Sequence, residues 1–233
     1  MSTDTAILVT LLDGPMQSWG HASRFQRRTT ALHPTRSGIF GMLCAALGVE
    51  KGSEAEKQWL ARLAPEAGVR LTVLTLPRQP EGCREPLAIR RLEDFHTVKG
   101  TRNAENKPKN DAVITHRQYL LDARFGVLLH GPREVLDEVA AALRNPRWGI
   151  WCGRKACIPA APVLQGVVAT EGEALTLLGE TGRGMQEFVT VVEADSFAEG
   201  TDTLMDSPVN FKTREFKPRR IAVGVPATDP AGD

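Results

Sequence analysis

The order of apolar segments in this sequence predicts an α+β protein built on a ferredoxin-like domain. Up to residue 164, strand and helix patterns follow the order strand, helix, strand, strand, helix, strand, which is the order of that fold. After Gln165 the chain has strand patterns and no long helix, which indicates a β-rich C-terminal appendage. We therefore expect a domain over 1–164, an appendage over 165–226 and a disordered tail over 227–233.

The first elements of the predicted domain are short and clearly bounded. Residues 6–12 are almost all apolar and predict a strand buried on both faces. Thr35 is a favourable N-cap for a helix whose apolar residues recur at helical spacing up to Leu47, and Gly48 ends it. A second, short helix is expected over 54–63, before Pro65, and an alternating, half-buried strand over 69–76.

Prolines mark the limits of the later helix. Residues 113–121 and 123–129 predict two strands around Asp122, or one long strand with a bend. A helix begins at Pro132 and ends before Pro146. We expect a short strand over 148–151, a tight basic turn over 152–155, and further strands near 187–192 and 221–225.

Composition excludes several classes of protein. The chain has 233 residues, of which 42% are hydrophobic, so it can bury a substantial core. It has no apolar run of about 18 residues and no leader-like N-terminus, so we expect a cytoplasmic protein without a membrane span. The closest of the four cysteines are spaced C-x4-C without a nearby histidine, and phosphate-binding or nucleophile motifs are missing. We expect reduced thiols, no metal and no cofactor.

Charge is segregated along the chain although the formal net charge is only +1. The stretch 14–48 has no acidic residue and carries four arginines and two histidines. A long basic loop or projecting hairpin is expected over 78–111. The charged residues of 166–207 are acidic apart from one arginine, and those of the segment that follows are mainly basic. Opposed patches suit a subunit that meets nucleic acid on one side and protein on another, and solvated loops of mixed charge are the alternative.

RNA binding is the function that the basic segments favour. Single-stranded RNA is held by stacking bases on aromatic rings or guanidinium groups, while cations and backbone amides bind the phosphates. Aromatic residues lie near arginines or histidines at Trp19, Phe25, Phe95, Tyr119 and Trp148. For Trp19 and Phe95, burial in the core is an equal alternative to stacking.

A metal-free ribonuclease is a second, weaker hypothesis. Such an enzyme needs a base, an acid and a cation for the phosphorane. His96 with Lys99, and His116 with Arg117 and Tyr119, supply these residue types. A third hypothesis is a scaffold whose arginines pair only with the acids of a protein partner.

Five stretches resemble a known family. They are GPMQSWG at 14–20, PTRSG at 34–38 with the small-residue helix after it, DFHTV at 94–98, RQYLLDA at 117–123 and GRKAC at 153–157. On these motifs the sequence is identified as a member of the Cas-five family of CRISPR-associated proteins, in the RAMP superfamily. It resembles in particular the branch found in the type I-E Cascade complex.

The resemblance implies a RAMP-type, RRM-like ferredoxin body with a projecting thumb within 87–115. It implies a non-catalytic Cascade subunit that binds and caps the 5′ handle of the CRISPR guide RNA in antiviral defence. The implied partners are that RNA and the neighbouring backbone and large subunits, with target DNA met only through the complex and no membrane. A sister branch in type I-C systems cleaves the precursor RNA with Tyr, Lys and His residues, so an endoribonuclease is the alternative.

We expect the RNA groove to combine the acid-free stretch with the basic loop and the basic turn. Arginines of the stretch would bind phosphates, Gly38 would let the helix start approach the RNA backbone, and Trp19 would stack. The predicted RNA-binding set is Gln17, Trp19, Arg24, Arg27, Arg28, Arg36, Ser37, Gly38, His96, Lys99, Arg102, Arg117, Tyr119, Arg154 and Lys155. No catalytic and no metal-binding residue is predicted.

Overall fold

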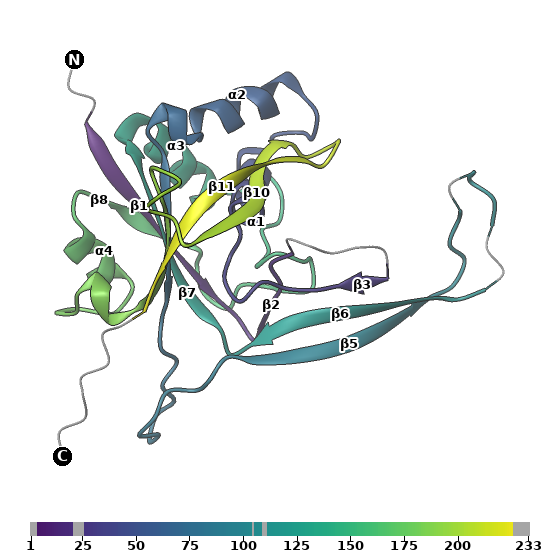
Figure 1. The fold of residues 1–233 in the computed structure, drawn as a ribbon, viewed down its shortest axis with the longest axis horizontal. Helices are drawn as coiled ribbons and strands as arrows, with labels where there is room; N and C mark the ends of the chain where they lie inside the picture. The colour runs from purple at the N-terminus through teal and green to yellow at the C-terminus, as the bar shows by residue number, and fades with distance from the viewer. Residues whose placement is uncertain (1–3, 21–25, 104, 109–110, 226–233) are drawn as a thin grey trace.

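A seven-stranded antiparallel sheet organises the computed structural model, which describes residues 4–20, 26–103, 105–108 and 111–225 (Figure 1). The strand order is β10-β11-β9-β4-β7-β1-β8, and every neighbouring pair is antiparallel. The strands are β1 (Thr5–Asp13), β4 (Arg70–Thr75), β7 (Arg124–Pro132), β8 (Leu164–Val168), β9 (Val189–Glu193), β10 (Asp202–Asn210) and β11 (Glu215–Gly224). The expected combination of helices with antiparallel strands is confirmed.

Helices cover both faces of this sheet. Side chains alternate between the faces along a strand, so β1 directs Leu8 toward one cluster of buried residues and Val9 toward another. The first cluster holds buried side chains of α1 and α3, with α2 beside them, and the second holds those of α4. The helices are α1 (Arg36–Leu47), α2 (Glu54–Arg62), α3 (Arg133–Arg144) and α4 (Glu171–Leu177), with 3-10 turns at Pro65–Ala67 and Met185–Glu187.

Helix α1 has the end signals that its sequence predicts. The Thr35 hydroxyl accepts a hydrogen bond from the Gly38 N–H, which satisfies one of the free donors of the first turn. Gly48 has a φ of +71°, a left-handed conformation that glycine adopts without a Cβ penalty. The local sequence therefore sets both ends of the helix that borders the candidate site.

A second, smaller sheet extends away from the first (Figure 1). Its main part is the antiparallel pair β5 (Arg90–Val98) and β6 (Val113–Leu121), which we call the hairpin arm. The short strands β2 (Met16–Gln17) and β3 (Arg27–Arg28) pair with the base and middle of β6. Asp122, at a φ of +61°, separates β6 from β7, so the alternative of two strands is correct and they belong to different sheets.

Two expectations about individual strands are wrong. Residues 148–151 form no strand, and the outer strand beside β1 is β8 instead. The strand β4 is buried on both faces, since Val73 packs on the side of α1 while Leu74 packs on the side of α4. Its alternating pattern arises because the buried Thr72 lies within the sheet and not at the surface.

The C-terminal strands are not a separately packed appendage. β9 pairs with β4, β11 pairs with β9, and β10 completes the sheet at its edge. Their side chains contribute Val191 and Ile221 to the same buried cluster as α1. The predicted tail at 227–233 lies outside the described residues. In the part of the chain that the structure describes, no helix combines the length and apolarity needed to cross a membrane.

Candidate nucleic-acid interface

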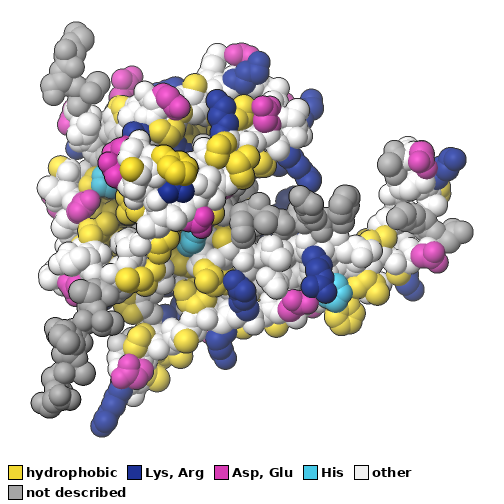
Figure 2. Space-filling view, viewed as in Figure 1, with side chains coloured by type: hydrophobic (Ala, Val, Ile, Leu, Met, Phe, Trp, Pro, Cys, Tyr) yellow, Lys and Arg dark blue, Asp and Glu magenta, His cyan; other side chains and the backbone are white. Residues whose placement is uncertain are grey.

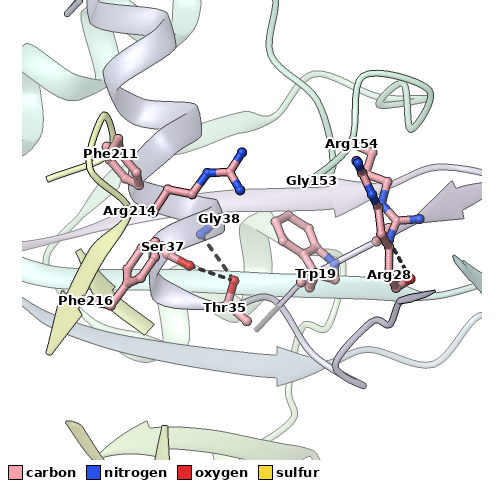
Figure 3. A pocket seen from close by; sticks show the side chains of 12 residues that line it. Trp19, Arg28, Thr35, Ser37, Gly38, Gly153, Arg154, Phe211, Arg214 and Phe216 are labelled. Atoms are coloured by element: carbon pink, nitrogen blue, oxygen red, sulfur yellow. Dashed lines mark hydrogen bonds between the residues drawn. The ribbon is translucent and has the colours of Figure 1, made fainter. Parts of the chain in front are cut away.

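A cavity of about 840 Å³ opens where α1 begins (Figure 3). Its walls come from the segment after β2, from β3, from the first turn of α1, from the turn at 152–157 and from the turn between β10 and β11. We call it the arginine cavity, because the charged residues that line it are Arg28, Arg154 and Arg214, without an acidic residue among its lining. Cations gathered in a cleft without opposing carboxylates produce a positive potential that attracts anions.

Trp19 lies in the lining of the cavity, and its buried indole is hydrogen-bonded to Gln17. The Gln17 amide donates to the carbonyls of Leu12 and Ala123, both at 2.9 Å, and its oxygen accepts from the Trp19 indole N–H at 3.0 Å. Gln17 is fully buried and Trp19 is only 1% exposed. Their prediction as RNA contacts is therefore wrong, because the amide is satisfied internally and the indole has no free face for a base.

Gly38 has a different role from the predicted one. A Cβ at this position would lie 2.8 Å from Cε3 of Trp19 and 3.0 Å from the Thr35 hydroxyl. The absence of a side chain thus makes room for the Trp19 ring under the first turn of α1. Ser37, beside it, lines the cavity.

Arg36 is a core residue and not a phosphate contact. Only 1% of it is exposed, and its guanidinium pairs with Glu193, donates to the Leu63 carbonyl at 2.7 Å and lies 4.3 Å from the centre of the Phe40 ring. Burial lowers the pKa of Arg36, and the ion pair with Glu193 opposes that shift. The predicted RNA contact is wrong because the carboxylate that neutralises this arginine comes from a distant strand.

Asp206 and Arg219 complete a buried ion cluster with Arg36 and Glu193. Asp206 accepts the backbone N–H of Arg36 at 2.8 Å, so a protein carboxylate occupies this donor of the helix N-terminus. Arg219 contacts Asp206 at 2.6 Å and Glu193 at 3.3 Å. The cluster joins the start of α1 to β9, β10 and β11, which places the β10–β11 turn beside the cavity.

Arg154 connects the basic turn to β3 and β6. Its guanidinium donates to the carbonyls of Gln118 at 3.2 Å and Arg28 at 2.7 Å, and it lies 5.0 Å from the centre of the Tyr119 ring. Tyr119 is 3% exposed, so its predicted contact with RNA is wrong. Gly153 has a φ of +93°, and a Cβ there would fall 1.8 Å from the Ser18 carbonyl oxygen, so this turn requires glycine.

Phe211 and Arg214 of the turn between β10 and β11, and Phe216 at the start of β11, line the cavity opposite Arg28 and Arg154 (Figure 3). The Phe211 N–H donates at 3.0 Å to the buried carboxylate of Glu56, which fixes the turn against α2. These residues are missing from the predicted set. The basic stretch after residue 207 was a signal, but no local pattern indicates that it folds beside α1.

The hairpin arm carries the remaining predicted residues away from the cavity. Arg27 and Arg28 in β3 run parallel to His116 and Arg117 in β6. Side chains of different kinds are interspersed over the arm on the face shown in Figure 2. Of the predicted RNA-binding residues other than Tyr119, His96 lies in β5, Arg117 lies in β6, and Lys99 and Arg102 follow β5; none of these four lines the cavity.

The two arm histidines lie beside acids. His96 is 2.7 Å from Asp94, and His116 is 3.4 Å from Glu93. Arg24 lies outside the described residues, and Lys155 lines a neighbouring cavity discussed below. Of the predicted set, Arg28, Ser37, Gly38 and Arg154 therefore meet at one cavity, with the buried Trp19 also in its lining.

A metal centre is not formed by the described residues. Within them, no three side chains of His, Cys, Asp or Glu are grouped so that they could hold an ion. The four cysteines are free thiols, and burial raises the pKa of Cys152 to about 12. The arginine cavity itself offers guanidinium groups, which bind anions, and aromatic rings.

Comparison with known proteins identifies the family. Residues 7–224 match the family model described as CRISPR-associated protein (Cas_Cas5). The chain belongs to the Cas5 family. It is 30% identical over 218 residues to the CRISPR system Cascade subunit CasD of Escherichia coli (strain K12), covering 90% of this chain and 93% of CasD. The resemblance found in the sequence is confirmed.

Two solved structures are similar to this Cas5 family member over most of their length. A chain of a CRISPR RNA-guided surveillance complex has a TM-score of 0.70 and 29% identity, covering 97% of this chain and 93% of that one. A structure described as a crystal structure of Cas protein has a TM-score of 0.63 and 29% identity, with 94% of each chain covered. The whole described fold, including the C-terminal strands, is therefore typical of these relatives.

Proposed function

We propose that this Cas5 family member is a non-catalytic subunit of a Cascade-type complex that binds the 5′ handle of the guide RNA in the arginine cavity. Membership of such a complex is supported by the similarity to CasD and to a chain of an RNA-guided surveillance complex. The observation that carries the handle-binding site is the cavity itself, with three arginines and no acidic residue in its lining.

The surroundings of the arginines support binding of a polyanion. Arg28 and Arg214 form no ion pair with a described residue, and Arg214 is exposed at a φ of +58° in its turn. Guanidinium groups bind phosphates with directed hydrogen bonds, and aromatic rings accept bases of any sequence. Phe211 and Phe216 provide such rings on the wall next to Arg214.

We also infer that the four strands β8-β1-β7-β4, with α1 and α3, are a RAMP-type ferredoxin-like body. Their antiparallel order supports this assignment, and the hairpin arm corresponds to the thumb. The arm exposes 65% of Phe95 and 47% of Ile114. Exposed apolar side chains on a projecting hairpin support contacts with the neighbouring backbone and large subunits. Target DNA would be met only through the assembled complex.

The burial of Tyr119 supports a non-catalytic role over the endoribonuclease alternative. Tyr119 lies beneath Arg154, while His96 and His116 are on the arm beside carboxylates. A general acid or base must be within hydrogen-bond reach of the reacting atoms. We expect purified protein to leave a repeat RNA intact in EDTA. Cleavage that is lost on His96→Ala or His116→Ala would overturn this assignment.

The handle-binding site is tested in the assembled complex. The double variant Arg28→Glu with Arg214→Glu places acids on two walls of the cavity, and we expect retention of labelled guide RNA to fall roughly tenfold or more. Lys212→Glu reverses one charge on the same turn as Arg214, outside the cavity lining, and should retain the RNA as the single-site control. Equal retention by both variants and the wild type would exclude the arginine cavity.

A further inference from the structure

A second cavity, of about 610 Å³, adjoins the arginine cavity along α1. Ser37, Gly38, Gly153 and Phe211 line both cavities. Because they share these walls, the two cavities are adjoining compartments at the start of α1. A polymer bound in the first compartment therefore lies within reach of the second.

Two tryptophans form the distinctive wall of the second compartment. Trp148 and Trp151 line it together with the face of α1 that carries Met42 and Ala45, and we call it the tryptophan cavity. The Trp148 N–H donates to the Ala45 carbonyl at 3.1 Å, which attaches its backbone to α1. The side chain remains exposed, at 45% for the whole residue. A large aromatic ring is thus held beside a cavity by its own backbone instead of being buried.

Lysines provide the charge of the tryptophan cavity. Lys51 lies just after the end of α1, and Lys155 lies in the basic turn next to Arg154. Both are exposed, and neither forms an ion pair with a described residue. The lining contains no acidic residue. An indole beside two unopposed cations matches an unpaired nucleobase with flanking phosphates better than it matches an apolar peptide.

We propose that the tryptophan cavity is a stacking subsite for an unpaired nucleotide of the RNA strand that runs through the arginine cavity. The base stacks on Trp148, and Lys51 and Lys155 bind the phosphates on either side. The cavity has the size of sites that enclose small ligands, which leaves room for one or two nucleotides. This inference rests on the proposed function, because it requires RNA in the adjoining compartment.

Photocrosslinking in the assembled complex tests the subsite. Guide RNAs carry 5-iodouridine at one position each, through the 5′ handle and the nucleotides that follow it. We expect irradiation to link one position, or two adjacent ones, to the peptide that contains Trp148, and Trp148→Ala to abolish the link. Loss of one stacked base should weaken RNA binding by at least about fivefold.

Trp59→Phe is the matched control. Trp59 is a partly buried tryptophan of α2 under the Arg62 guanidinium and lines neither cavity. This variant should keep both the crosslink and the affinity. Trp148→Phe, which retains a stacking ring, should restore most of the affinity that Trp148→Ala loses. The crosslink to wild-type protein provides a test that does not depend on the folding of any variant.

The outcomes separate this inference from the proposed function. If the Arg28→Glu and Arg214→Glu double variant loses RNA but no position crosslinks to Trp148, the stacking subsite is wrong and the arginine cavity stands. If the labelled positions crosslink only to neighbouring subunits and never to the peptide that contains Trp148, the RNA does not enter the tryptophan cavity and the inference is overturned. If the double variant retains RNA fully, the proposed function itself fails.

Discussion

The buried ion cluster and the arginine cavity both lie at the first turn of α1, and they use arginine in opposite ways. In the cluster, Arg36 and Arg219 face two carboxylates, Glu193 and Asp206. In the cavity, three arginines face none among the lining residues. An arginine therefore stabilises the fold where the structure supplies a carboxylate, and it is available to a ligand where the structure supplies none.

Arg36→Met should produce the largest effect on stability. It leaves Glu193 buried with only Arg219 as a charged partner, and removing one member of a buried ion pair costs about 3–5 kcal/mol of unfolding free energy. The same substitution at the exposed Arg28 should change stability by less than about 0.5 kcal/mol. Urea unfolding of both variants measures the difference. Similar stabilities would show that Arg36 is not a core residue.

Gly153→Ala tests how tightly the cavity wall is packed. Its Cβ would meet the Ser18 carbonyl oxygen, whereas Gly68, at a similarly positive φ of +80°, has nothing within 4 Å of the added atom. Both variants carry backbone strain, and only Gly153→Ala adds overpacking, which costs about 1–3 kcal/mol more. Thermal unfolding compares the two. Equal destabilisation would mean that the turn at 152–157 can move freely from the segment after β2.

Alkaline pH should lower the free energy of unfolding through Cys152, which lies in the same turn, by a smaller amount. Burial raises the pKa of Cys152 to about 12 from an ordinary value of 9.0, so the unfolded chain loses this proton first as the pH rises. The stabilisation is complete below pH 9 and decreases between pH 9 and 12, by about 1 kcal/mol at pH 10 for this thiol. Unfolding at pH 8 and pH 10 of wild type and Cys152→Ala measures the part that depends on Cys152. An identical pH dependence in both proteins would contradict the assignment.

Thiol alkylation of the native protein reports the same burial. Cys83 is exposed, while the other three cysteines are buried. At pH 8 we expect iodoacetamide to modify Cys83 rapidly and the buried thiols only on unfolding. Mass spectrometry of the digested protein identifies the modified residues. Rapid modification of Cys157 would show that the turn opens to solvent in the native state.

The sequence was sufficient to predict features that depend on neighbouring residues. Thr35 and Gly48 end α1 through interactions within a few positions, so its bounds could be predicted. The same holds for the basic turn that brings Arg154 to the cavity. Arg36 was misassigned because its partner Glu193 is 157 residues away along the chain. A one-dimensional pattern shows how many cations a segment has, but not which distant carboxylates neutralise them.

Three residues of the cavity were not predicted, and the reason is again a contact between distant parts of the chain. Phe211, Arg214 and Phe216 reach the cavity because β11 pairs with β9 and β9 with β4, which carries the β10–β11 turn to the start of α1. Strand pairing of this kind is set by long-range packing. The prediction of a separate C-terminal appendage was wrong for that reason, although its strands were expected correctly near 187–192 and 221–225.

The salt dependence of RNA binding shows directly whether Arg214 in the arginine cavity contacts a phosphate. Labelled 5′ handle RNA is titrated with wild type, Arg214→Ala and the control Lys212→Ala between about 50 and 200 mM salt, and log Kd is plotted against log salt concentration. If Arg214 binds a phosphate, its removal lowers the slope by about 0.7 and weakens binding, while Lys212→Ala leaves the slope unchanged. A slope for Arg214→Ala equal to that of the wild type would contradict the assignment of the arginine cavity to RNA.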